Sequence, residues 1–424
     1  MTRAPVSDPA PRQAAALRAL LQVILPRNAF YARKLAGCVL PGPEASLSEL
    51  LAALPFTTKE DLVADQAAHP PYGSDLSFPL DQYTRFNQTS ASSGKAPLRW
   101  LDTPASWQGL LDNWQVVYQA AGVQRGDRVF FAFSFGPFLG FWTAWEAALQ
   151  LGCFCVPGGG LSTGARLQAL LDHQITVLCC TPTYALRLGE VAAQEGVDLS
   201  QCQVRRLIVA GEPGGSIPAT RRQLERYWPA AKIHDHHGMT EVGPVSYECP
   251  HQPGLLHLIS EAYAAEVVDS ASGQPLPPGA TGELVLTTLT RVGSPLLRYR
   301  TGDLVKLAPA DCPCGLPALH GGILGRADDM ALVRGVNLYP SAVESILRGQ
   351  PGLAEYRVEL STHQGMTEVS VQAEPAPDCA HPEALRDRLE ALLRNSFHLR
   401  IPVQLVNPGA LPRFELKARR WVRV

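Results

Sequence analysis

The sequence predicts an α/β fold. A large N-terminal domain, with mainly parallel, helix-covered sheets and a β-rich subdomain, is expected to precede a small ferredoxin-like α+β C-terminal domain. Three observations support this. Strand and helix patterns alternate between residues 128 and 234, and short turn-punctuated strands follow from about residue 245. The last ninety or so residues then have a strand–helix–strand–strand–helix–strand order.

The alternating region justifies the parallel sheet. Strand patterns fall at 128–133, 153–157, 177–180, 206–210 and 232–234, with helical patterns between them at 138–151, 165–172, 182–195 and 217–227. Such alternation indicates parallel strands covered on both faces, and ligands bind beyond the carboxyl ends of these strands. The polar loops at 211–215 and 235–241 follow two of them. Cys179 and Cys180, in mid-strand, should point to opposite faces of the sheet.

Helical patterns precede this sheet. Residues 13–25 have helical apolar spacing and stop before Pro26, and residues 105–121 form another helical pattern. Residues 54–62 read as a turn into a helix. Thr57 or Thr58 is the candidate cap, and Glu60 and Asp61 lie in the first turn.

The β-rich region and the small domain follow. Strands are expected at 265–268, 283–288 and 304–307, separated by Gly- and Pro-containing turns. The small domain has strand patterns at 331–334, 356–360, 368–372 and 403–406, and helical patterns at 340–347 and 382–397. We place the boundary between an N-terminal domain of residues 1–326 and a C-terminal domain of residues 327–424.

Composition excludes several classes of protein. The 424-residue chain is 46% hydrophobic and 18% charged with a net charge of −2, so neither a nucleic-acid nor a membrane partner is expected. No apolar run reaches transmembrane length, and the polar N-terminus lacks the apolar stretch of a signal peptide. A cytoplasmic location follows, in which the ten cysteines are reduced.

Two stretches suggest nucleotide binding. Residues 89–95 (Thr-Ser-Ala-Ser-Ser-Gly-Lys) form a hydroxyl-rich loop that can direct backbone N–H groups and a lysine at an anion, although a simple polar turn remains an alternative. It is not a Walker loop, because Thr89 stands where the first glycine should be. Asp303, on a strand-to-turn junction, suits the hydroxyls of a ribose or caps its own turn.

Taken together, several motifs resemble the acyl-adenylate-forming enzymes, and within them the phenylacetate–CoA ligase family. The similarity covers nearly the whole chain in order. It rests on residues 54–62 (Leu-Pro-Phe-Thr-Thr-Lys-Glu-Asp-Leu), 89–95, 210–214 (Ala-Gly-Glu-Pro-Gly), 238–241 (Gly-Met-Thr-Glu), 295–303, 325–330, 334–340 and 411–417. The resemblance implies two domains and two half-reactions. ATP and an aromatic acid give an acyl-adenylate and pyrophosphate, and coenzyme A then takes the acyl group and releases AMP.

The resemblance also implies roles for individual residues. The catalytic group would be Lys417, which bridges the substrate carboxylate and the α-phosphate, with Thr240 on that phosphate and Glu241 on Mg²⁺. Asp328 would be the hinge between the domains. The remaining nucleotide contacts would be Ser90, Ser92, Ser93, Gly94 and Lys95 at the β- and γ-phosphates, Gly211, Glu212, Pro213, Asp235 and His236 at the adenine, and Asp303 and Arg326 at the ribose.

The acyl pocket implied by the family would be lined by Phe135, Gly136, Ala210, His236 and Gly238, and aromatic and small residues of this kind suit a flat aryl acid. His236 and His237 depart from the family, which commonly has an aromatic residue before this glycine. An imidazole here either bonds a ring substituent or packs in the core.

A structural Zn²⁺ site is a further expectation. Cys312 and Cys314 offer two thiolates and Cys249 a third. His257 is the fourth ligand implied by zinc-bearing relatives, with His251 and His320 as competitors, and free thiols remain the alternative.

Three residues depart from the family pattern and raise the possibility of weak adenylation: Ala91 in the loop, and Phe414 and Leu416 near Lys417. Two alternatives to the CoA ligase therefore stay open. One transfers the acyl group to a carrier-protein thiol or an amine. The other is a non-catalytic nucleotide-binding protein. The resemblance also implies a homodimer.

Overall fold

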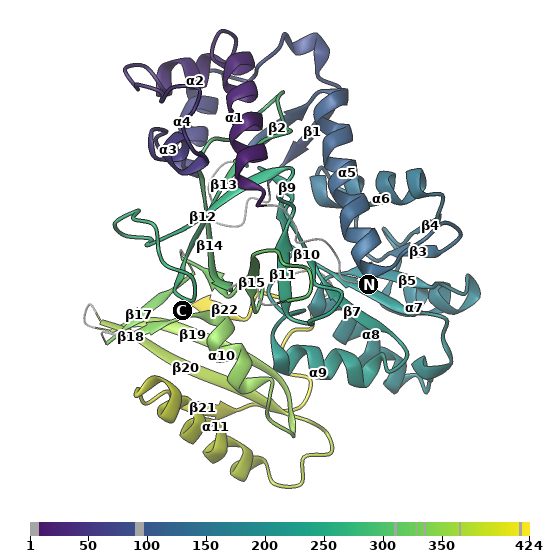
Figure 1. Cartoon of the computed structure of the whole chain (residues 1–424). Helices are drawn as coiled ribbons and strands as arrows, with labels where there is room; N and C mark the ends of the chain where they lie inside the picture. Colours follow the sequence, from purple (N-terminus) through teal and green to yellow (C-terminus); the bar gives the residue numbers. More distant parts are fainter. Residues whose placement is uncertain are drawn as a thin grey trace.

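The computed structural model describes residues 8–89, 97–308, 312–327, 329–334, 336–363, 366–414 and 418–424. It confirms the predicted α/β class, with a parallel sheet, an antiparallel β-rich region and a C-terminal α+β part (Figure 1). No helix in these ranges is long and apolar enough to cross a membrane.

Four helices begin the chain: α1 (Ala10–Ile24), α2 (Ala29–Lys34), α3 (Leu47–Ala52) and α4 (Lys59–Ala68). Thr58 caps α4, since its side chain accepts from Asp61 N and the Asp61 carboxylate accepts from Thr58 N. Thr57, the other candidate cap, is instead buried, and its hydroxyl donates to Leu297 O at 2.8 Å. The signature at 54–62 therefore anchors α4 to the β-rich region.

The five-stranded parallel sheet has the order β4-β3-β5-β6-β7. Its strands are β3 (Arg128–Phe131), β4 (Phe154–Pro157), β5 (Val177–Cys180), β6 (Arg206–Val209) and β7 (Lys232–Asp235), and its helices are α5 (Pro104–Ala121), α6 (Leu139–Leu151), α7 (Thr163–Asp172), α8 (Pro182–Gln194) and α9 (Pro218–Tyr227).

Two cores cover the two faces of this sheet. Phe131 and Cys179 pack in the core that contains α5 and α6, whereas Phe130 and Cys180 pack with α7, α8 and α9. Figure 1 shows the same layers, with α5 and α6 above the strands and α8 and α9 below. The predicted opposite orientation of Cys179 and Cys180 is thus confirmed.

The β-rich region is a seven-stranded sheet in which β16 pairs beside the path β10-β11-β15-β14-β13-β12. These strands are β10 (Ser246–Glu248), β11 (Leu255–Leu258), β12 (Tyr263–Val268), β13 (Thr281–Thr288), β14 (Tyr299–Ala308), β15 (Ala318–His320) and β16 (Gly325–Arg326). Two hairpins stand apart: β1 (Arg85–Gln88) with β2 (Arg99–Asp102), and β8 (Gly238–Met239) with β9 (Gly243–Pro244).

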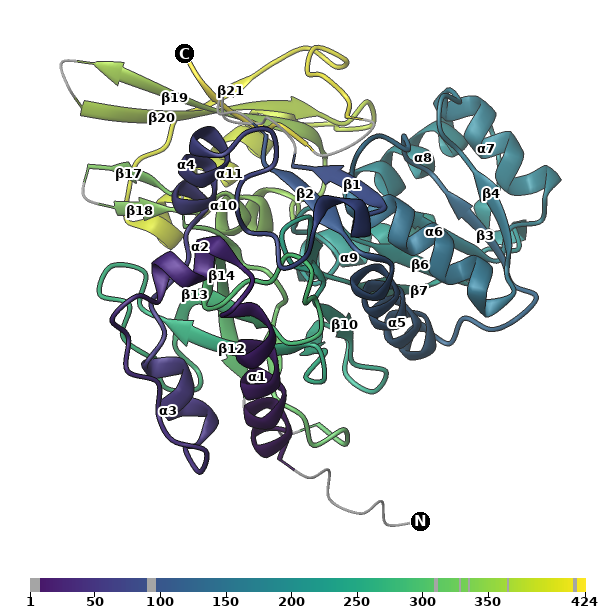
Figure 2. The same cartoon turned by 90° about the horizontal axis from the view of Figure 1, so that it is seen from above.

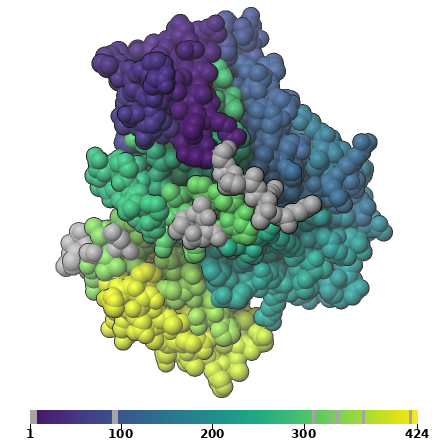
Figure 3. All heavy atoms as spheres, viewed as in Figure 1, coloured from purple at the N-terminus to yellow at the C-terminus, as the bar shows by residue number. Residues whose placement is uncertain are grey.

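The C-terminal part has its own core, formed by residues 331–421. Its elements are β17 (Ala331–Val333), β18 (Val336–Leu338), α10 (Pro340–Leu347), β19 (Leu353–His363), β20 (Met366–Pro375), α11 (Pro382–Phe397), β21 (Val403–Leu405) and β22 (Trp421–Arg423). In Figure 2, β19 and β20 lie along the edge of the molecule opposite the N-terminus. The residues of this C-terminal part, light green to yellow, form the lower lobe in Figure 3.

One predicted strand of this part forms but pairs differently from what was expected. The strand at 331–334 was expected to open the βαββαβ sheet, but within the described residues β17 pairs with β18 alone, in a separate hairpin. The four-stranded sheet has the order β21-β20-β19-β22, and its last strand is the C-terminal β22, parallel to β19. The sequence does not reveal this arrangement, because β22 is too short to be recognised by its pattern and forms by pairing with β19.

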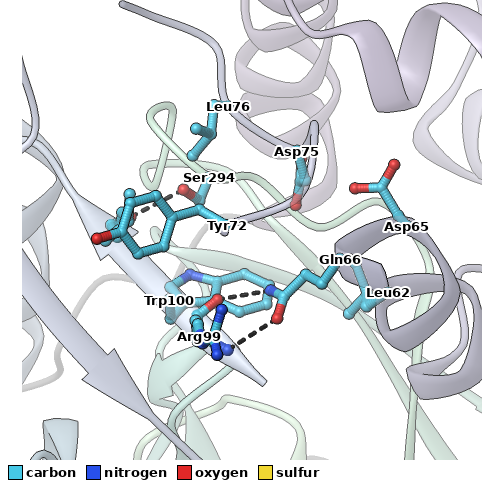
Figure 4. A pocket seen from close by; sticks show the side chains of 10 residues that line it. Leu62, Asp65, Gln66, Tyr72, Asp75, Leu76, Arg99, Trp100 and Ser294 are labelled. Atoms are coloured by element: carbon cyan, nitrogen blue, oxygen red, sulfur yellow. Dashed lines mark hydrogen bonds between the residues drawn. The ribbon is translucent and has the colours of Figure 1, made fainter. Parts of the chain in front are cut away.

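A small pocket, partly open to solvent, lies between α4, β2 and the 72–76 segment (Figure 4). Gln66 closes one side, because its amide bonds both the N–H and the carbonyl of Arg99. The Asp75 carboxylate accepts from Asn28 at 2.9 Å through Oδ1, and its buried Oδ2 has no hydrogen-bond partner among the described residues. Burial raises the pKa of Asp75 to about 8.

We predict that Asp75→Asn stabilises the chain relative to wild type more at high than at low pH. Between the ordinary aspartate pKa and about 8, folded Asp75 holds a proton that the unfolded chain has released, so wild-type stability falls as the pH rises through this window. Asparagine cannot ionise. Between about pH 5 and about pH 8, the difference in unfolding free energy should shift by at least about 1 kcal/mol in favour of Asn.

Urea denaturation at the two pH values measures this difference. Asp81→Asn is the matched control, because Asp81 lies on the exposed turn η1 (Leu80–Gln82) and its surroundings change little on unfolding. An equal effect of Asp75→Asn at both pH values contradicts the prediction.

Candidate active site

The predicted ribose carboxylate, Asp303, is held by two partners. Its Oδ1 accepts from Arg326 at 3.1 Å, and its Oδ2 lies 3.0 Å from His237 Nε2. Asp303 and Arg326 are register partners on β14 and β16. Gly302, at φ +76°, permits this approach, because a Cβ there would lie 2.7 Å from an Arg326 nitrogen. The carboxylate is thus fixed in orientation and has lone pairs left for hydroxyl donors.

The turn after β8 carries Thr240 and Glu241. The Glu241 side chain is buried, and its Oε1 lies 3.4 Å from the Tyr299 hydroxyl and 3.5 Å from Lys59 Nζ. Burial, reinforced by the negative charge of Glu241, raises the pKa of Tyr299 well above its ordinary value, so Tyr299 donates a hydrogen bond. A carboxylate in these surroundings offers hard oxygen ligands for a divalent cation.

An arginine that the sequence did not reveal fixes this turn. Arg291 donates to both oxygens of Asp102, at 2.7 and 2.6 Å, and its third nitrogen donates to the carbonyls of Thr240 and Glu241, both at 2.9 Å. Arg291 is 1% exposed and Asp102 is fully buried. The ring of Trp100 lies 5.3 Å from the guanidinium. Arg291 therefore ties the 240–241 turn to strand β2.

Strand β2 is one arm of the hairpin that carries the predicted phosphate loop. At the end of the hairpin next to this loop, Thr89 N donates to Leu98 O at 2.9 Å, and Leu98 N donates to Thr89 Oγ1 at 3.0 Å. The loop itself lies outside the described residues, as do the predicted hinge and catalytic lysine. This applies to Ser90, Ala91, Ser92, Ser93, Gly94, Lys95, Asp328, Leu416 and Lys417.

The ends of β6 and β7 bring the other expected nucleotide residues together. Ala210 and His236 follow these neighbouring strands, and Gly211 turns the chain at φ +94°. Both carboxylate oxygens of the next residue, Glu212, are engaged: Oε1 accepts from Thr183 N at 2.9 Å and Oε2 from Ala418 N at 2.8 Å. Pro213 follows Glu212 in the same loop.

Asp235 and His236 are built into a buried network. Ser216 donates to Asp235 at 2.6 Å, and Asp235 N donates to Glu248 at 2.9 Å. Burial, with Glu248 nearby, raises the pKa of Asp235 to about 7. Burial lowers the pKa of His236 to about 4, so this imidazole is neutral and its Nδ1–H donates to Ser246 O at 2.7 Å. The centroid of its ring lies 4.5 Å from that of Trp114, so the His236 ring packs in the interior, one of the two roles expected for it.

Aromatic rings form a wall around Phe135, a residue of the predicted acyl pocket. Phe135 contacts the rings of Phe133, Trp142 and Trp145, with centroids 5.7, 5.0 and 5.4 Å away. Gly136 O accepts from the Trp142 indole at 2.9 Å. Gly238 lies on β8, so close to the carbonyl of Gly243 that an added Cβ would approach it to 2.8 Å. The wall offers flat apolar surfaces that suit a planar ring.

Four predicted metal ligands converge elsewhere, where β10, β11 and the start of β15 meet. Ligand atoms of Cys249, His257, Cys312 and Cys314 all lie within 4.8 Å of one another. His257 Nδ1 lies 3.2 Å from Pro317 O, so the ring hydrogen is on Nδ1. The lone pair of Nε2, 3.3 Å from the Cys312 sulfur, is then available to bind a metal. Three sulfurs and one imidazole fit a tetrahedral structural zinc ion. The competitors His251 and His320 are not in this cluster.

Comparison with known proteins decides the family. Residues 106–290 match the model of an AMP-binding enzyme, and residues 335–423 match that of an AMP-binding enzyme C-terminal domain. A phenylacetate-coenzyme A ligase of Thermus thermophilus is 31% identical over 94% of this chain and 92% of its own. The chain belongs to the phenylacetate–CoA ligase family. The phenylacetate-coenzyme A ligase of Escherichia coli is also 31% identical, over 92% of this chain and 89% of its own.

Membership of the phenylacetate–CoA ligase family confirms the predicted AMP-forming acid–thiol ligase, and with it the nucleotide and coenzyme A. A solved structure of 2-hydroxyisobutyryl-CoA ligase with its acyl-adenylate, in the postadenylation state, is 27% identical. It superposes over 100% of this chain and 94% of its own with a TM-score of 0.91. The same enzyme in the thioesterification state gives 0.72. The two lobes of this chain are thus arranged as in the postadenylation structure.

Four further residues that complete the site were not predicted from the sequence. Arg291 and Asp102 gave no signal of their own, because each acts through a partner far away in the chain. Lys59 and Tyr299 stood inside the recognised motifs 54–62 and 295–303, so their places beside Glu241 were open to prediction.

Proposed function

We propose that this enzyme activates an aromatic carboxylic acid, aryl or arylacetic, and transfers it to coenzyme A. An oxygen of the acid attacks the α-phosphorus of ATP, and the bond to pyrophosphate breaks. The coenzyme A thiolate then attacks the acyl carbon of the adenylate, and AMP leaves with the bonding electrons. Adenylation is needed because a carboxylate has no good leaving group, and the work of the site is to neutralise charge around phosphate.

The observation that carries the proposal is the proximity of two anchored carboxylates, Glu241 and Asp303, to Tyr299. Glu241 bonds its hydroxyl, and both Glu241 and Asp303 act electrostatically on it. We assign Asp303 and Arg326 to the ribose, Thr240 to the α-phosphate and Glu241 to Mg²⁺, which would neutralise phosphate charge. Gly211, Glu212, Pro213, Asp235 and His236 would surround the adenine, and residues 90–95 the leaving pyrophosphate.

The choice of an aromatic acid rests on the wall around Phe135. Trp142 and Trp145 pack against Phe135. Together with Gly136, Ala210, His236 and Gly238 they would line a pocket that favours a flat ring. The phenylacetate-named relatives support this choice. The 2-hydroxyisobutyryl-CoA ligase carries an aliphatic acyl group, so the chemistry of the acid is the first point to test.

Lys417 would bridge the acid and the α-phosphate during adenylation, and rotation at Asp328 would then give the thiol access. On this proposal residues 1–326 and 327–424 act as separate domains. A structural zinc ion, a homodimer and a cytoplasmic location complete the proposed description.

A screen of carboxylic acids for ATP-dependent AMP release, with and without coenzyme A, tests the activity. We expect an aryl or arylacetic acid to give acyl-CoA, identified by mass. We also expect Lys417→Ala to lower acid-dependent pyrophosphate exchange by about 100-fold or more, while much of the thioester formation from a supplied acyl-adenylate remains.

The outcomes of this screen separate the alternatives. AMP release without acyl-CoA would favour a carrier protein or an amine as acceptor. No AMP from any acid contradicts the proposal and favours a non-catalytic nucleotide-binding protein. Wild-type pyrophosphate exchange in Lys417→Ala removes Lys417 from the reaction.

Zinc is tested by metal analysis of the purified chain. About one zinc ion per chain is expected, together with a lower melting temperature after chelation. Cys314→Ser should lose most of the metal, whereas His251→Asn, which changes a histidine outside the cluster, should retain it. A metal-free wild-type chain whose four ligand residues react freely with thiol and imidazole reagents would refute the site.

A further inference from the structure

Among the described residues, three polar contacts join the C-terminal lobe to helices and loops of the parallel-sheet region. Ala418 N donates to Glu212 Oε2 at 2.8 Å, and Gln223 Nε2 on α9 donates to Arg348 O at 2.9 Å. Arg413 Nε lies 3.8 Å from Glu190 Oε2 on α8. Helices α8 and α9, which carry Glu190 and Gln223, pack on one face of the parallel sheet. Glu212 is bonded to the start of α8, so the three partners share a rigid base.

Glu212 is the contact nearest to the reaction centre. Its other oxygen, Oε1, accepts from Thr183 N in the first turn of α8, where the helix dipole also favours a negative charge. The carboxylate thus connects the start of α8 with the backbone N–H of Ala418. Ala418 directly follows Lys417 in the chain. The bond therefore fixes the residue next to the proposed catalytic lysine.

The segment before Lys417 is braced from within its own lobe. Glu374 accepts from Gly409 N, Leu411 N and the Arg413 guanidinium. Glu374 is 1% exposed, and these donors, the Arg413 guanidinium first among them, lower its pKa, so it is ionised when it holds them. Residues 409–413 therefore meet Glu190 as a preformed unit. Rotation of the C-terminal lobe would break the contacts with Glu190 and Glu212 together.

We propose that Glu212 is a positioning residue for the first half-reaction: its carboxylate, bonded to Ala418 N, holds the residue that follows Lys417 beside the start of α8, and this bond must break before thioester formation. This inference rests on the proposed function, in which Lys417 serves adenylation. A contact present in one lobe arrangement and absent from another shifts the population between them by its full free energy. The agreement of the whole chain with the postadenylation structure, TM-score 0.91 against 0.72, is the arrangement expected with this contact formed.

Glu212→Gln tests the role with little change in shape. An amide has one acceptor oxygen where the carboxylate has two, so one of the two N–H groups loses its partner. Helix α8 keeps its side-chain cap, because Thr181 Oγ1 still accepts from Tyr184 N. Hydrogen bonds to charged groups imply that the lobe populations shift by about tenfold.

Two readouts follow. Native-state hydrogen exchange of the Ala418 amide, without ligands, should become about tenfold faster in Glu212→Gln. With phenylacetate as the probe, the rate of thioester formation from phenylacetyl-adenylate and coenzyme A, divided by the rate of pyrophosphate exchange, should rise about tenfold. A ratio is decisive because a merely destabilised or poorly binding enzyme loses both rates together.

Glu195→Gln is the matched control, since Glu195 is exposed at the other end of α8 and should leave both readouts unchanged. An unchanged Ala418 exchange rate, or an unchanged ratio with both rates lowered, overturns the proposal. If wild type gives no pyrophosphate exchange with any acid, the proposed function fails. Hydrogen exchange of the Ala418 amide then still decides whether Glu212 holds Ala418.

Discussion

The buried ion pair between Arg291 and Asp102 is the interaction on which the rest of the candidate site depends. Both groups are removed from water, at a desolvation cost that only complete hydrogen bonding offsets. The guanidinium meets this condition by dividing its donors between the Asp102 carboxylate and the carbonyls of residues 240 and 241. Losing either charged partner would leave the other buried and unpaired, so the two segments are held together strongly.

The pair fixes two parts of the site relative to each other. Strand β2 supports the predicted phosphate loop, and the 240–241 turn carries the groups proposed to act at the α-phosphate and on Mg²⁺. Charge stabilisation in a phosphoryl-type reaction depends on groups that are already in place when charge moves. Lys59 and Tyr299, which contact Glu241, extend the same support to α4 and β14.

Local patterns predicted much of this architecture. Alternating strands and helices gave the parallel sheet, and the Thr58 capping box and the two faces of Cys179 and Cys180 followed from local chemistry. Spacing predicted two of the metal thiolates, and family resemblance supplied His257. The features that the sequence did not predict depend on tertiary contacts. Arg291 lies in an irregular segment and pairs with Asp102, 189 positions earlier in the chain. Strand β22 exists only through its pairing with β19.

Pyrophosphate exchange in Arg291→Lys tests the central claim most directly. Lysine keeps the charge but cannot reach both Asp102 oxygens and both carbonyls in one plane. In protein verified as folded, we predict that kcat for acid-dependent exchange falls by about 100-fold, because displacements of about 1 Å at reacting groups have effects of this size. KM for ATP should change much less, since the ribose contacts at Asp303 are separate. A folded Arg291→Lys enzyme with wild-type kcat would contradict the account.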